Sequence, residues 1–102
     1  MESVLRFVFE LPVDPKALEG DVALAIFATE CLYGKLRVRV ETGFLVEPDG
    51  SSCAIRIQGA AGHAVAKIFA GFAAARLGED GYRVHRQKGR MPSVAAATGG
   101  GS

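Results

Sequence analysis

The sequence has no tryptophan, only two cysteines and no long uncharged run. Two cysteines, Cys31 and Cys53, are too few for a disulfide scaffold or a closed zinc site, and both fall in apolar patterns, so we expect buried free thiols. Uncharged apolar stretches such as "VALAIFAT" are far shorter than the roughly 20 residues that a bilayer span needs. The sequence therefore predicts neither a disulfide-rich protein nor a membrane partner.

A strong net charge is also missing. The formal charge is +1, so no overall field draws the chain toward nucleic acid or a membrane surface. The first residues, "MESVLRFVFELP", lack the order of a secretory signal because Glu2, Arg6 and Glu10 interrupt the apolar run. We expect a cytoplasmic protein.

The length of 102 residues, with 49% apolar and 23% charged residues, is typical of a single folded domain. We place this domain at residues 1–88. The remainder, "GRMPSVAAATGGGS", is rich in Gly, Ala and Ser and cannot bury enough surface to stay ordered. Residues 89–102 are therefore predicted to be a flexible C-terminal tail.

Hydrophobic periodicity predicts four strands and two helices. Residues 4–11 alternate as a strand, and Asp14 and Pro15 then suit a helix start that Gly20 separates from a main helix over 21–33. The stretch "KLRVRVETGFLVE" alternates without a slip, which predicts one strand over 35–47. A turn at 48–51 leads into a strand over 52–58, and a helix over 60–77 and a strand over 82–87 complete the domain.

The hairpin register follows from the alternation. If Glu47 pairs with Ser52, the apolar side chains of both strands share one face. The element order β-α-β-β-α-β predicts a four-stranded antiparallel sheet in the order 4-1-3-2, with two helices on one face. In topology this α+β two-layer sandwich resembles the ferredoxin-like fold, which hosts many unrelated functions.

Two features predict self-association. In the order 4-1-3-2 the strand over 35–47 lies at an edge, and residues 35–41 extend beyond its partner, so Arg37 and Arg39 flank an open edge that could pair with a second copy. The helices carry few charges, and Gly62, Ala66, Ala70 and Ala74 form a small-residue row that could receive another helix. The alternatives are a solvated edge protected by its charges and a row that packs within the chain.

The sheet face away from the helices carries clustered cations. If it binds nucleic acid, the residues responsible are Arg6, Arg37, Arg39, Arg56 and Arg83. The layout resembles the RNA-recognition motif, but the positions that would hold stacking aromatics are Val8, Ala54 and Arg56. An acidic protein partner or a plain solvated surface explains the same pattern.

The sequence contains only weak signals of a catalytic or ligand-binding site. His63 and His85 are expected to share one rim that could hold an anion or a small ligand, near the start of the second helix. No carboxylate accompanies them, so the sequence predicts no metal site, no cofactor and no enzymatic activity. The favoured function is a non-enzymatic homodimeric interaction module, joined through the strand edge at 35–41 or through the Ala-rich helices, and the alternative is nucleic-acid binding on the basic face.

Overall fold

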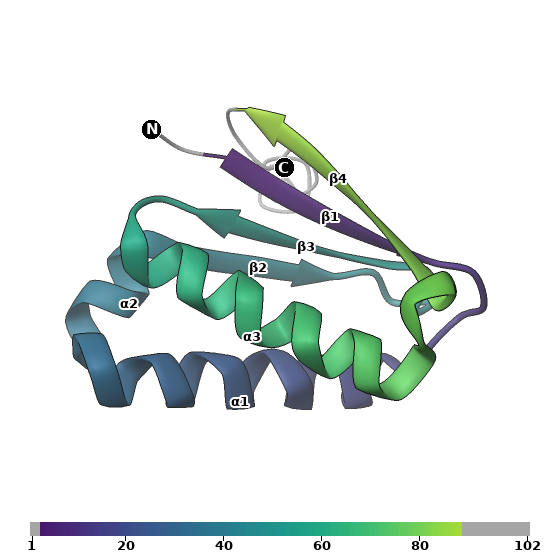
Figure 1. Ribbon diagram of the computed structural model, residues 1–102, viewed down its shortest axis with the longest axis horizontal. Helices are drawn as coiled ribbons and strands as arrows, with labels where there is room; N and C mark the ends of the chain where they lie inside the picture. Colours follow the sequence, from purple (N-terminus) through teal and green to yellow (C-terminus); the bar gives the residue numbers. More distant parts are fainter. Residues whose placement is uncertain (1–2, 89–102) are drawn as a thin grey trace.

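The computed structural model describes residues 3–88 and shows an open four-stranded antiparallel sheet with three α-helices (Figure 1). The strands are β1 (Ser3–Phe9), β2 (Thr42–Val46), β3 (Ser52–Ile57) and β4 (Tyr82–Lys88). The helices are α1 (Pro15–Tyr33), α2 (Lys35–Glu41) and α3 (Ala60–Leu77), and a short 3₁₀ helix, η1 (Glu79–Gly81), precedes β4. The predicted tail lies outside the described residues.

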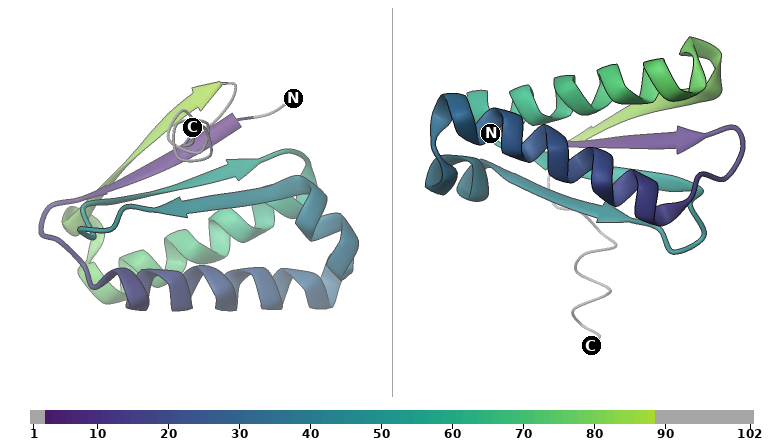
Figure 2. Two further views of the ribbon diagram at one scale, coloured as in Figure 1. Left: turned by 180° about the vertical axis from the view of Figure 1, so that it is seen from behind. Right: turned by 90° about the horizontal axis from the view of Figure 1, so that it is seen from below.

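The strands lie in the order β2-β3-β1-β4, which is 4-1-3-2 when it is read from β4. The predicted hairpin register is confirmed: Thr42, Phe44 and Val46 lie opposite Ile57, Ile55 and Cys53, and the Glu47 N–H donates to the Ser52 carbonyl at 3.0 Å. Both long helices cover one face of the sheet (Figure 2).

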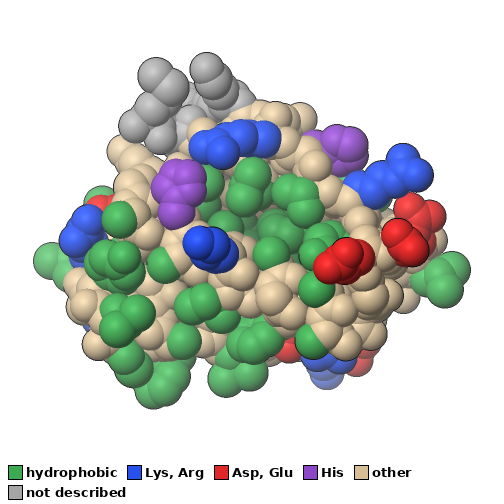
Figure 3. Space-filling view, viewed as in Figure 1, with side chains coloured by type: hydrophobic (Ala, Val, Ile, Leu, Met, Phe, Trp, Pro, Cys, Tyr) green, Lys and Arg blue, Asp and Glu red, His purple; other side chains and the backbone are tan. Residues whose placement is uncertain are grey.

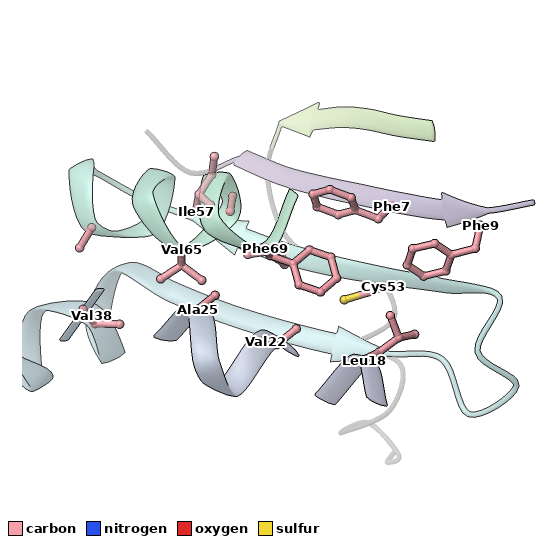
Figure 4. Packing of buried hydrophobic residues seen from close by; sticks show 13 residues of the cluster. Phe7, Phe9, Leu18, Val22, Ala25, Val38, Cys53, Ile57, Val65 and Phe69 are labelled. Atoms are coloured by element: carbon pink, nitrogen blue, oxygen red, sulfur yellow. The ribbon is translucent and has the colours of Figure 1, made fainter. Parts of the chain in front are cut away.

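The core lies between this sheet face and the two long helices (Figure 4). Phe7 of β1 and Phe69 of α3 meet edge to face, with ring centroids 4.9 Å apart. Leu18, Val22 and Ala25 bring one side of α1 onto the same cluster. Asp14 caps α1 by accepting from the Lys16 N–H at 3.1 Å, and the helix continues through Gly20 without the predicted break.

The prediction of a strand over residues 35–41 is wrong. Gly34, at φ 90°, ends α1, and the next seven residues form α2. Seven alternating residues fit either structure, because in a helix Leu36 and Val40 lie 40° apart while Val38 points to the opposite side. Only Val38 of the three enters the core, so no strand edge exists at 35–41.

The bonds of Glu41 favour a helix over a strand at residues 35–41. Its carboxylate accepts from Arg37 Nε one helical turn earlier and from the Ala61 N–H at the start of α3, both at 2.9 Å. Its carbonyl accepts from the Gln58 N–H, also at 2.9 Å. An i,i+4 pair of this kind favours a helix over a strand, and these bonds join the end of α2 to the start of α3.

Glu41 provides a test of this junction through pH. The Arg37 guanidinium lowers the pKa of its carboxyl below the ordinary value of 4.5, and the Ala61 and Gly62 N–H groups add to this against the opposing effect of partial desolvation. A carboxylate with a lowered pKa stabilises the fold above its unfolded pKa, and this contribution is lost as the pH falls through the folded value. We expect Glu41→Gln to lower the free energy of unfolding at neutral pH, and the deficit to shrink as the pH falls below 4.5.

Urea unfolding of both proteins across this range measures the deficit. Arg37→Gln removes the main donor and should abolish most of the pH-dependent part. A deficit of equal size at neutral and acidic pH would contradict the assigned role of the carboxylate.

Close packing at Gly62 provides a second test. A Cβ there would overlap the Glu41 carbonyl oxygen and lie 3.0 Å from Ile57 Cα, so Gly62→Ala should cost about 1–3 kcal/mol of stability. Gly71 is the matched control on the same helix, because a Cβ there meets nothing within 4 Å. Gly71→Ala should stabilise the protein by about 0.5–1 kcal/mol in the same urea titration. Equal effects of the two substitutions would show that α3 does not approach this junction closely.

Candidate interaction surface

The outward side of α1 carries no charge over most of its length. From residue 20 to the end of the helix, the exposed positions are Gly20, Ala23, Leu24, Phe27, Ala28, Cys31 and Leu32. The larger side chains are strongly exposed, Leu24 by 57%, Phe27 by 64% and Leu32 by 78%. A surface helix normally turns polar residues to water, so this arrangement is unusual.

The two charges of this part of α1 do not interrupt the surface. Asp21 is buried, and its carboxylate accepts from Arg76 Nε and Nη2 of α3 at 3.1 and 3.0 Å. This bidentate pair ties α1 to α3 on the side of α1 that faces the core. Glu30 lies one helical turn after Phe27, at the margin of the outward side, and is only partly exposed.

Helix α2 adds two apolar side chains at the C-terminal end of α1. Because Val38 occupies the core, Leu36 and Val40 turn outward and are 78% and 60% exposed. Figure 3 shows hydrophobic side chains gathered along the lower edge and the left end of the molecule, over α1 and α2. We call Leu24, Phe27, Leu32, Leu36 and Val40, with the small residues between them, the apolar face.

The size of the apolar face can be compared with known interfaces. Side chains of this kind expose on the order of 100 Å² each, so the five present roughly 500 Å². Monomeric proteins rarely expose a contiguous apolar patch above a few hundred Å², and a specific interface buries about 800 Å² per partner. The apolar face is therefore at the upper end of what monomeric proteins expose and corresponds to the apolar centre of an interface, not to all of it.

The two cysteines differ in environment, and the prediction that both are buried is wrong for Cys31. Cys53 lies in the core, and burial raises the pKa of its thiol to about 12. Cys31 is exposed on α1, one helical turn from Phe27. The rate at which the Cys31 thiol reacts therefore measures whether the apolar face is accessible.

Three of the predicted basic residues do lie on the open face of the sheet. The register places Arg6, Arg56 and Arg83 there together with His85. Arg56 donates to the Thr42 carbonyl at 3.2 Å, and Arg83 lies 3.4 Å from the Glu10 carboxylate. Val4 and Ala54 of the same face are buried, with Leu45 packed against them, so apolar side chains separate the arginines.

The other two basic residues lie elsewhere. Arg37 and Arg39 belong to α2, and the assignment of both to the sheet face is wrong. The Arg37 guanidinium bonds to Glu41 and lies 5.1 Å from the centroid of the Tyr33 ring. Arg39 lines a hollow of about 250 Å³ beside Ile26 and Phe44.

The two histidines are not brought together. His85 pairs with Arg6 in the register and faces the open side of the sheet, whereas His63 lies on α3, on the covered side. The sheet separates them, so the predicted rim does not form. His63 instead lines a hollow between α3 and β4 with Lys67 and Val84.

The small-residue row of α3 faces its own chain. Gly62 and Ala66 are buried, and Ala70 and Ala74 are half-buried. The sequence interpretation noted the few charges of the helices, but it did not identify the exposed apolar residues of α1. The signal was available, because Asp21 and Glu30 are the only charges between residues 20 and 34.

Residues 3–88 contain no group of three or more His, Cys, Asp or Glu side chains placed to hold a metal ion. Within the same range, no helix is long and apolar enough to cross a bilayer. No protein-family model matches the chain, and no curated protein matches its sequence.

Proposed function

We propose that the protein is a non-enzymatic interaction module that forms a homodimer through its apolar face. The observation that carries this proposal is the uncharged outward side of α1, with Leu24, Phe27 and Leu32 more than half exposed. Burial of such side chains is the main favourable term in association.

A second copy of the same chain suits this face better than a charged partner. In a twofold dimer each residue near the axis meets its own copy, so a charge there would oppose an identical charge. The outward side of α1 carries no charge between Gly20 and Gly34. Two α1 helices can therefore pack against each other around Phe27 with only the partly exposed Glu30 at the margin of the contact.

The alternative, nucleic-acid binding, has lost part of its support. Two of its five arginines lie on α2, and Arg83 is close to Glu10. Phosphate binding depends on clustered, available cations. If generic RNA nevertheless binds at low salt and dissociates steeply as salt rises, this alternative gains over the dimer as the function.

The proposal extends to the architecture, which we describe as a ferredoxin-like sandwich with α2 added between α1 and β2. The strand order and the two long helices on one face support this description. It carries no functional argument, because function resides in sites and not in the fold.

The dimer is tested by Phe27→Glu, which introduces a charge at the centre of the face. For the unmodified chain, sedimentation equilibrium at micromolar concentration should give twice the chain mass of 10.7 kDa. Phe27→Glu should give the mass of one chain, because each buried carboxylate would face its own copy. Since Phe27 is exposed in the single chain, the fold should persist, with a change in stability within about 0.5 kcal/mol.

Leu11→Glu is the matched control. Leu11 is 77% exposed but lies in the β1–α1 connection, away from the C-terminal half of α1, so this variant should remain dimeric. Thiol labelling gives an independent readout, because Cys53 is inert and Cys31 should react more slowly as the dimer forms. A single-chain mass for the unmodified protein, or a Phe27→Glu protein that stays dimeric, would refute the proposed interface.

A further inference from the structure

A second apolar surface lies on the other side of α3, away from the apolar face. Here the helical layer stops short of β4, and a hollow of about 240 Å³ remains between α3 and the β1–β4 pair. It is lined by Leu5, Phe7, His63, Ala66, Lys67, Ala70 and Val84. Figure 3 shows it in the upper centre, with a hydrophobic floor between cationic and histidine side chains.

The hollow exists because small side chains face a wide gap. Ala66 and Ala70 project from α3 toward Leu5 and Val84, and a methyl group is too short to reach across to β4. Val84 points to the helical side of the sheet yet is 45% exposed. The floor is therefore apolar surface that water covers.

The ionisable side chains that line this hollow are basic. Lys67 follows His63 by one turn of α3, and both line the hollow. Arg86 lies two residues beyond Val84 on β4, so it projects from the same side of the sheet, and it is exposed. No acidic side chain lines the hollow. A ligand that fits both features has an apolar body and an anionic end.

We propose that this hollow binds a small amphipathic carboxylate, with its hydrocarbon part on Leu5, Val84 and the two alanines and its carboxylate at Lys67 and His63. The volume is below that of drug-sized sites and, at roughly 30 Å³ per water-sized group, holds about eight such groups. This size corresponds to an unbranched chain of about six to eight carbons. The site is independent of the proposed dimer.

The experiment is an NMR titration of the ¹⁵N-labelled full chain with octanoate, using octanol as the uncharged comparison. Octanoate should shift the amides of β1, β4 and the first half of α3, with a Kd on the order of 1 mM. From butanoate to octanoate, each added methylene should tighten binding up to about fourfold, because it is removed from water. Octanol should bind about tenfold more weakly, because it lacks the charge.

Two variants test the two halves of the site. Ala70→Leu fills the hollow and should weaken octanoate at least tenfold, whereas Ala75→Leu, at an exposed position of the same helix, should not change it. Lys67→Glu reverses a rim charge and should weaken octanoate about tenfold without affecting octanol, and its exposed position keeps the fold intact. Shifts confined to α1 and α2, equal affinity for octanol, or undiminished binding by Ala70→Leu would each overturn the proposal.

Discussion

The structure depends on the junction at Glu41. One carboxylate accepts from Arg37 in α2 and from the first N–H groups of α3, and the adjoining carbonyl bonds to Gln58. The end of α2 is thereby held against the end of β3 and the start of α3, which lie further along the chain. Gly62 allows the close approach that this requires, since a side chain there would overlap the Glu41 carbonyl.

The surfaces follow from this junction. With α2 held as a helix, Val38 closes the end of the core, while Leu36 and Val40 face outward at the end of the uncharged side of α1. The chain thus combines a well-packed interior with apolar surface that its own elements do not cover. If a second molecule covers that surface, the small number of charges on α1 has a simple physical explanation.

Much of the fold was accessible from the sequence. The alternation of apolar and polar residues predicted which side chains of β1, β3 and β4 face the helices and which face the open side of the sheet. The turn before Ser52 predicted the β2–β3 register. Residues 35–41 were misassigned because a seven-residue alternating pattern suits a strand as well as a helix with one buried residue. The Arg37–Glu41 pair and the tertiary contacts of Glu41 favour the helix. That error placed Arg37 and Arg39 at a sheet edge. The hollow beside Val84 was not predictable, because it depends on how far α3 extends over β4.

Intermolecular NOEs test the central claim most directly. Equal parts of ¹³C-labelled and unlabelled protein are mixed, and only contacts between different chains are recorded. The account predicts contacts from the Phe27 ring to methyl groups of Leu24 and to side chains near Cys31 in the other chain. Intermolecular contacts that arise only from β2 or β4, or none at a concentration where the protein is dimeric, would contradict it.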